Sequence, residues 1–295
     1  MKSIAEEFVH VRRGRMYLYL RPSHAEALLG IQVQRIGEWL ETHYWAREVA
    51  FGRSTLAVKR PALPDGSGLV IKGYHHGGLL GRLLGKRYFS KRRALNAIAA
   101  GDTARRAGVP VPLSVLAAAE RAFLFGYHIY EASVEVSGAE PLGLALNLGA
   151  SLPARVPRGM RSRRRLVIEA SARVVRALHD AGVDHRDLNL ANLLATQSGG
   201  QVTVYVLDFD SVRVGAPLSL ARRLHALHRM YRSAVKLHPQ HQPPPPLMQA
   251  RWLRAYCAGN EELAAYLLKR RATFSRHTRW HQILWRTQSS SRRAA

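Results

Sequence analysis

The side chains best suited to chemistry in this sequence are two carboxylates and an amide. Asp187 and Asn192 lie five positions apart in the run HRDLNLAN at 185–192, and Asp208 follows in the run LDFD at 207–210. A carboxylate can orient an attacking hydroxyl and accept its proton, while an amide oxygen and a second carboxylate are hard ligands that suit Mg²⁺ beside phosphates. The pattern predicts a phosphoryl-transfer site, with Asp187 as the base and Asn192 and Asp208 as the metal ligands.

The elements around these residues are predicted to hold them in place. Apolar residues at helical spacing predict a helix over Leu166–Ala181, with Gly182 as its C-terminal cap. Leu193-Leu194 and Val202–Phe209 read as two strands joined by a Ser-Gly-Gly turn, which predicts a hairpin between Asn192 and Asp208. His185 is interpreted as structural, hydrogen-bonding the backbone near Asp208.

The N-terminal half has a different pattern, rich in strands and turns. Strands are expected at Ser54–Val58, at Leu69–Lys72 and, as one long strand or a pair, at Ala122–Ala132. A helix is expected over Lys91–Arg106, where Gly108 and two prolines stop it. After Leu237, helix is expected again from Leu247 to about Trp285, with a start at Asn260.

Together the two motifs resemble the protein-kinase signature, in which HRDLxxxN is followed by Asp-Phe-Gly. The chain departs from that signature at Asn189, where protein kinases usually carry lysine, and at Asp210, which replaces the glycine. With the runs LVIKGYHHGGLLGRLL at 69–84 and GVPVP at 108–112, the sequence looks more like the bacterial lipopolysaccharide-core sugar kinases. The resemblance is greatest to kinases of 3-deoxy-D-manno-octulosonic acid (Kdo) and covers about residues 50–235.

The resemblance implies an α+β, two-lobed protein-kinase-like fold. The expected N-lobe spans 1–136, the C-lobe spans 137–288 with the catalytic loop and basic C-terminal helices, and a disordered tail follows at 289–295. Lys59 and Lys72 each end an apolar strand. The family-like run that follows Lys72 favours it as the lysine that positions the nucleotide phosphates. Gly52 would lie in the phosphate-covering loop, and the adenine of ATP would lie against the backbone near Val134 and Val136.

The resemblance also implies a function and its cofactors, ATP and Mg²⁺. The γ-phosphate of ATP would pass to the Kdo residue of a lipid A precursor during lipopolysaccharide core biosynthesis. Heptose or a small soluble molecule is an alternative acceptor. A catalytically dead kinase-like module that binds membrane or protein is a further alternative. It is favoured by the single glycine of the phosphate loop and by Asp102 being the only carboxylate between Lys72 and Glu120, but opposed by the intact Asp187, Asn192 and Asp208.

Charge is the unusual feature of the composition. The chain has 45 Lys and Arg against 20 Asp and Glu, a formal charge of +25, which favours a polyanionic partner. A basic cluster at 269–286 is interleaved with tryptophans, which suits a membrane interface. Together with this pattern, the resemblance implies a peripheral protein on the cytoplasmic side of the inner membrane. No nucleic-acid module is recognised, so no nucleic acid is expected. The single cysteine, Cys257, excludes an internal disulfide framework and a Cys-rich zinc site.

Overall fold

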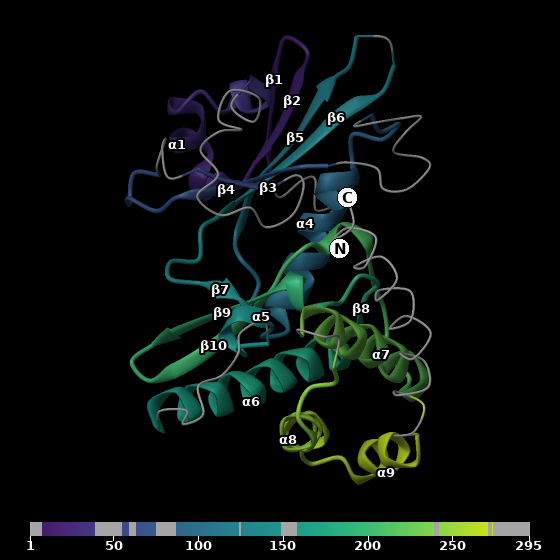
Figure 1. Ribbon diagram of the computed structural model, residues 1–295. Helices are drawn as coiled ribbons and strands as arrows, with labels where there is room; N and C mark the ends of the chain where they lie inside the picture. Colours follow the sequence, from purple (N-terminus) through teal and green to yellow (C-terminus); the bar gives the residue numbers. More distant parts are fainter. Residues whose placement is uncertain are drawn as a thin grey trace, which may run out of the picture. The chain divides into compact units, whose positions relative to one another are not determined.

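The computed structural model describes residues 8–38, 55–58, 63–74, 87–123, 125–148, 158–238, 242–270 and 273. The chain divides into two compact units (Figure 1). Unit 1 comprises Met1–Asp102 and Pro112–Ser137, and unit 2 comprises Thr103–Val111 and Gly138–Ala295. The lobe bounds expected from the sequence stay predictions, and the expected tail at 289–295 lies outside the described residues.

Unit 1 is built on a six-stranded antiparallel sheet in the order β1-β2-β5-β6-β4-β3. Its strands are β1 (Val9–Arg13), β2 (Met16–Leu20), β3 (Thr55–Val58), β4 (Leu69–Gly73), β5 (Ser114–Arg121) and β6 (Tyr127–Val134). The short helix α1 (Ala25–Gly30) follows β2, flanked by single turns of 3₁₀ helix at Pro22–His24 and Val33–Arg35. Helix α4 (Arg93–Arg106) begins within unit 1, close to the predicted start at Lys91.

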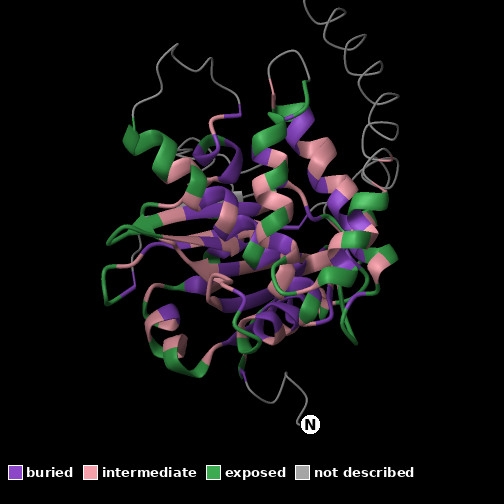
Figure 2. Cartoon of the chain, turned by 90° about the horizontal axis from the view of Figure 1, so that it is seen from below, coloured by how far each residue is buried: buried purple, intermediate pink, exposed green. Residues whose placement is uncertain are grey.

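The two faces of this sheet bury separate apolar clusters, because successive residues of a strand point to opposite faces. Leu69 and Ile71 of β4 pack in one cluster, together with Leu28 of α1. Ile129 of β6 packs in the other, against Leu95 and its neighbours in α4. Buried residues of both clusters are drawn purple in Figure 2. The α4 side of the sheet is therefore the side that Tyr74, and with it Lys72, faces.

The strand predicted at Ala122–Ala132 is wrong over its first half, where the chain turns. Strand β5 ends at Arg121 and β6 begins at Tyr127, with Gly126 at φ +78° between them. A Cβ at Gly126 would lie 2.8 Å from the carbonyl oxygen of Tyr88, so this close approach requires glycine. Strand β5 was missed because its alanine run, 117–119, has little strand propensity; tertiary packing places these small side chains in the core.

Unit 2 is mainly helical. Its helices are α5 (Leu142–Ala145), α6 (Arg158–Asp180), α7 (Leu220–Leu237), α8 (Pro246–Cys257) and α9 (Glu261–Lys269). Short antiparallel sheets join β10 (Gln201–Val206), β9 (Leu193–Ser198) and β7 (Glu140–Pro141), and pair β11 (Val212–Val214) with β8 (Val183–His185). The predicted hairpin is therefore confirmed as β9 and β10. No described helix is both long and apolar enough to cross a membrane.

Two predicted helix caps in unit 2 are confirmed. Gly182 ends α6 with φ +72°, and a Cβ there would lie 1.9 Å from the carbonyl oxygen of Gly215. The Asn260 side chain accepts a hydrogen bond from the amide of Leu263 at the start of α9. Helix α6 starts eight residues before the predicted Leu166, because its arginine-rich first turns are exposed and carry no apolar period. Helix is found after Leu247 as predicted, in α8 and then in α9, which begins after the predicted cap Asn260. The rest of the expected helix, toward Trp285, lies outside the described residues.

Candidate active site

Asn189 organises the loop that carries the predicted base. This loop follows β8 and runs into a turn of 3₁₀ helix at Leu190–Asn192. The Asn189 Oδ1 caps the turn by accepting the amides of Ala191 (2.8 Å) and Asn192 (3.3 Å). Its Nδ2 donates to the Asp187 backbone oxygen (3.0 Å) and to Asp187 Oδ1 (3.1 Å). One side chain thus fixes the turn and one carboxylate oxygen together.

Asn192 holds Asp187 from the other side. Its Nδ2 donates to the backbone oxygen of Asp187 (2.8 Å) and, more weakly, to Oδ2 (3.4 Å). Each oxygen of the exposed Asp187 carboxylate therefore accepts one neutral amide N–H, which orients the carboxylate without placing a cation on it. Because the amide nitrogen of Asn192 points to Asp187, its Oδ1 is left as an oxygen ligand of the kind that a hard cation prefers.

Asp208 is placed next to this loop by the backbone. The amide of Leu207 donates to the carbonyl of Asn192 (2.9 Å), just after β10 ends. Asp208 itself adopts a left-handed conformation, φ 63° and ψ 69°, which is uncommon for a residue with a Cβ and recurs at functional sites. The structure thus brings Asp187, Asn192 and Asp208 into one segment of unit 2. None of the described residues forms a cluster of three or more His, Cys, Asp or Glu that could hold a metal ion.

His185 contacts the backbone next to Asp208, as predicted. Its Nε2 lies 2.8 Å from the Leu207 carbonyl oxygen, and its ring meets Phe209 edge-on with centroids 5.7 Å apart. Burial lowers the pKa of His185, so the ring is neutral at pH 7 and donates from Nε2. The predicted structural role of His185 is confirmed, since it connects β8 to the backbone immediately before Asp208.

Lys72, the predicted phosphate contact, lies in unit 1 on β4. It is the direct cross-strand partner of Glu131 on β6, and its Nζ lies 4.8 Å from the ring centroid of Tyr74. Asp102, the only carboxylate of α4, binds the guanidinium of Arg21 through both of its oxygens, at 2.8 and 3.0 Å. Gly52 and the alternative lysine, Lys59, lie outside the described residues.

The segment expected to meet adenine is part of unit 1. The amide of Val134 donates to the Leu113 carbonyl and that of Glu135 to the Gly68 carbonyl, both at 2.9 Å. These two donors are used within the unit, so a base docking here would need the carbonyl groups or the amide of Val136. The adenine contact at Val134 and Val136 stays a prediction.

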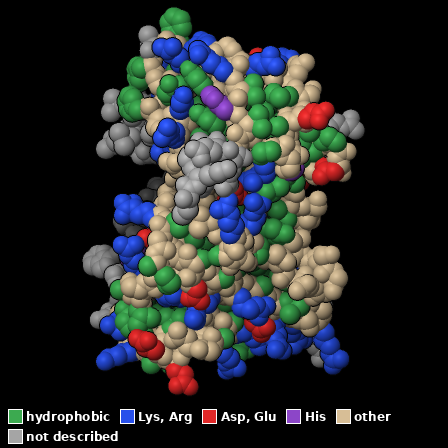
Figure 3. All heavy atoms as spheres, turned by 180° about the vertical axis from the view of Figure 1, so that it is seen from behind, with side chains coloured by type: hydrophobic (Ala, Val, Ile, Leu, Met, Phe, Trp, Pro, Cys, Tyr) green, Lys and Arg blue, Asp and Glu red, His purple; other side chains and the backbone are tan. Residues whose placement is uncertain are grey.

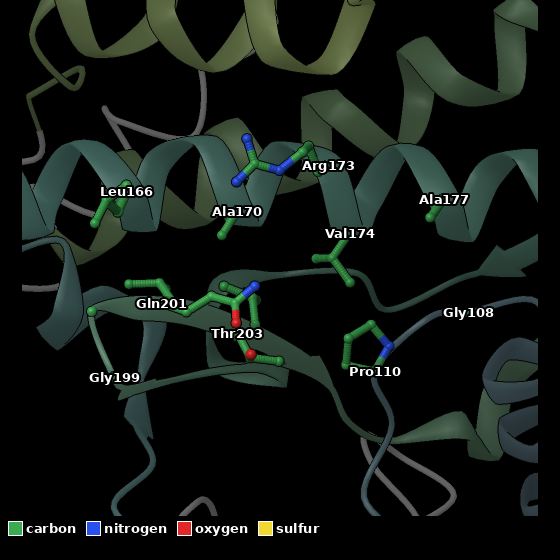
Figure 4. A pocket seen from close by; sticks show the side chains of 13 residues that line it. Gly108, Pro110, Leu166, Ala170, Arg173, Val174, Ala177, Gly199, Gln201 and Thr203 are labelled. Carbon is green, nitrogen blue, oxygen red and sulfur yellow. The ribbon is translucent and has the colours of Figure 1, made fainter.

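A hollow of about 720 Å³ in unit 2 lies away from these residues. It is formed by one side of α6 and by the β9–β10 turn, with Val174 pointing toward Pro110 (Figure 4). Asp187, Asn192 and Asp208 are not among its lining residues. The hollow is therefore separate from the predicted catalytic segment.

Comparison with known proteins assigns the chain to a family. Residues 39–256, which include the whole catalytic segment and Lys72, match the model of the lipopolysaccharide kinase (Kdo/WaaP) family. The chain belongs to this family. Its relatives include the 3-deoxy-D-manno-octulosonic acid kinases of Mannheimia succiniciproducens and Photobacterium profundum. The first is 24% identical over 67% of this chain and 82% of the relative, and the second 30% identical over 63% and 72%.

A solved structure supports the fold independently of these names. A WaaP protein in complex with acyl carrier protein is similar over 78% of this chain and 84% of that one, with a TM-score of 0.53 at 20% sequence identity. The predicted α+β, protein-kinase-like fold is therefore confirmed. The range of the resemblance found in the sequence, about residues 50–235, lies within the range 39–256 that the Kdo/WaaP family model matches.

The sequence analysis does not predict the roles of two polar residues, Asn189 and Glu131. It identifies Asn189 only as a departure from protein kinases, although its position two residues after Asp187 is a signal for a capping role. Glu131 gave no local signal, because its relation to Lys72 arises only when β4 and β6 pair.

Proposed function

We propose that this protein is an ATP-dependent kinase that phosphorylates a hydroxyl of the Kdo residue on a lipid A precursor. The observation that carries the proposal is the Asp187 carboxylate, held between the amides of Asn189 and Asn192 with Asp208 beside them. The names of the relatives, all Kdo kinases, support the acceptor.

The proposed chemistry assigns one task to each side chain. Asp187 orients the acceptor hydroxyl and takes its proton as the oxygen attacks the γ-phosphorus, while the bond from that phosphorus to the ADP oxygen breaks. Asn192 Oδ1 and the Asp208 carboxylate would hold Mg²⁺, which neutralises phosphate charge when bound. Lys72 would contact the nucleotide phosphates from unit 1.

We further propose that the protein works at the cytoplasmic surface of the inner membrane as a peripheral protein. Its charge supports this, since Lys and Arg form several groups on the face shown in Figure 3, where acidic side chains are fewer. In the arginine-rich start of α6, Arg158, Arg161 and Arg165 are exposed. Most of the basic, tryptophan-containing cluster at 269–286 lies outside the described residues, and its membrane role stays a prediction.

The test of the activity is transfer from labelled ATP in the presence of Mg²⁺. A Kdo-bearing lipid A precursor should be labelled by the wild type and not by Asp187→Asn. A heptose-bearing core acceptor and a soluble aminoglycoside would serve as the competing acceptors. Transfer to either of these but not to Kdo would refute the proposed acceptor, and an absence of transfer to all three would refute the proposed activity.

A further inference from the structure

Three exposed phenylalanines gather at one end of the unit 1 sheet. Phe123 and Phe125 lie in the turn between β5 and β6, where they are 88% and 45% exposed, and Phe89 is 74% exposed. The rings of Phe89 and Phe125 stack with centroids 6.2 Å apart. Reciprocal 2.8 Å hydrogen bonds between the backbones of Tyr88 and Tyr127 fix the two segments side by side. We call Phe89, Phe123 and Phe125 the aromatic tip.

Cations are frequent in the segments that adjoin the aromatic tip. Three segments meet here: 9–17, 87–93 and 121–127. The turns of β1–β2 and β5–β6 lie at the same end of the sheet (Figure 1). The Arg15 guanidinium donates to the carbonyl of Arg121 at 2.6 and 2.9 Å, and the Arg87 guanidinium lies 5.2 Å from the Phe125 ring. The three segments contain no acidic residue, and their cations are Arg12, Arg13, Arg15, Arg87, Lys91, Arg92, Arg93 and Arg121.

This combination of side chains points to one class of partner. Exposed apolar rings such as those of phenylalanine enter the boundary between headgroups and acyl chains of a bilayer, and neighbouring Lys and Arg side chains are attracted to anionic lipid. We propose that the aromatic tip and its cations dock this protein on an anionic membrane surface, with the phenylalanines inserted between headgroups. This proposal deepens the proposed function, because it names the surface by which a kinase of a lipid-linked sugar would reach its acceptor.

The experiment measures binding of the full chain to vesicles with and without anionic phosphatidylglycerol. Since each Lys or Arg near an anionic leaflet strengthens binding by roughly fivefold, Arg87→Gln with Arg121→Gln should weaken it by about 25-fold at low salt. Phe89→Ser with Phe123→Ser should weaken it by about tenfold or more, with little dependence on salt. Leu247→Ser and Arg254→Gln are matched controls, because Leu247 is 70% exposed and Arg254 is an exposed cation, both in α8 of unit 2.

A site-specific probe tests insertion directly. Cys257 is the single cysteine of the chain, so a Cys257→Ala background allows one environment-sensitive fluorophore at Phe123→Cys and, as a control, at Leu247→Cys. The fluorophore at 123 should shift to the blue on anionic vesicles, while the one at 247 should not. Unchanged vesicle binding in both double variants, or no fluorescence shift at 123, would overturn the proposal. The proposal would also fail if the phenylalanine variant kept its binding to vesicles and instead lost self-association.

The same variants keep this inference separate from the proposed function. Phosphorylation of a soluble, delipidated Kdo acceptor should be unchanged in the phenylalanine variant, since neither Phe89 nor Phe123 is assigned a role in the reaction. A wild type that binds anionic vesicles but phosphorylates no acceptor would overturn the proposed function and leave the membrane surface standing.

A second observation concerns the counter-charge of Lys72. Glu131 is held by two hydroxyls, one on β5 and one just after β4: Oε1 accepts from Ser114 Oγ and Oε2 from the Tyr74 hydroxyl, each at 2.7 Å. As directly paired residues of antiparallel strands, Lys72 and Glu131 project from the same face with Cβ atoms about 4.5–5.5 Å apart. Lys72 Nζ lies over the ring of Tyr74, the residue whose hydroxyl binds Glu131.

The one carboxylate of α4, Asp102, binds an arginine of unit 1. Asp102 is buried and bound by both its oxygens to Arg21, whose Nε also donates to the Ser114 carbonyl at 2.8 Å. We infer that Glu131, a strand residue, is the positioning residue that orients Lys72 toward the nucleotide. This inference rests on the proposed function, because it assumes that Lys72 contacts the phosphates of ATP.

A double-mutant cycle tests the pair. Glu131→Gln should raise the KM for ATP or lower kcat by about tenfold. Lys72→Met should lower kcat/KM further. In the double variant the loss should be smaller than the two single losses combined. Glu120→Gln is the matched control, since Glu120 lies on β5 and binds the hydroxyl of Tyr130 at 3.3 Å. Additive losses, or equal losses for Glu120→Gln, would overturn the role of Glu131. Inactive wild type would instead overturn the proposed function.

Discussion

Asn189 offers the sharpest test of how the catalytic loop works, because one side chain has two separable jobs. Its Oδ1 caps the turn at 190–192, and its Nδ2 restrains Asp187. Replacing Asn189 by alanine removes both. Loss of an Asn cap costs about 1 kcal/mol of stability. Loss of the restraint frees one oxygen of a base that must align with the acceptor hydroxyl, and a misplacement of about 1 Å can lower the rate by about 100-fold.

The two effects separate with a second variant and a control. Asn189→Ser keeps an acceptor for the amides of Ala191 and Asn192 but has no amide to donate to Asp187. It should keep near wild-type stability and still lose kcat by about 10- to 100-fold. Asn260→Ala removes a comparable cap from α9, so it should cost about 1 kcal/mol and leave kcat unchanged.

The assays are urea denaturation and steady-state kinetics at saturating ATP and acceptor. If Asn189→Ser retains full kcat, Asn189 is only a cap and the amide restraint of Asp187 is irrelevant to the reaction. If Asn260→Ala lowers kcat as much as Asn189→Ala does, the loss reflects general destabilisation, and the reasoning fails.

Three further predictions follow from the site and its support. Asp187→Asn should lower transfer by about 10²- to 10⁴-fold with unchanged nucleotide affinity in a binding assay, and full activity would remove Asp187 from the mechanism. Asp208→Ala should abolish the increase in ATP affinity that Mg²⁺ produces, measured by calorimetry with and without the metal; an equal increase in both proteins would make Asp208 a mere strand-end acid. Burial lowers the pKa of His179 to about 3, and its Nδ1 lies 2.7 Å from the Tyr256 hydroxyl. Because folded His179 does not bind a proton that the unfolded chain binds below pH 6.5, the free energy of unfolding should fall as pH drops from 6.5 toward 3. The expected loss is about 2 kcal/mol between pH 7 and 5. Urea titrations should show this loss in the wild type and not in His179→Asn.

Local patterns were enough to predict the elements of the catalytic segment. The apolar period of α6, the cap at Gly182 and the two strands after Asn192 are each written in contiguous residues, and local propensity decides them. The family resemblance likewise rests on short runs, so it could be read without coordinates. For the same reason Asp187, Asn192 and Asp208 could be nominated from spacing alone.

Tertiary structure decided what pairs with what. The partner of Asp102 could not be predicted from local residues, because packing of α4 brings its carboxylate to Arg21, a residue 81 positions away. Glu131 lies opposite Lys72 only because β4 and β6 are neighbours in the sheet. Strand β5 forms despite its alanines because burial between α4 and the neighbouring strands outweighs their weak strand propensity. Charge pairing and burial depend on distance in space, which contiguous residues do not encode.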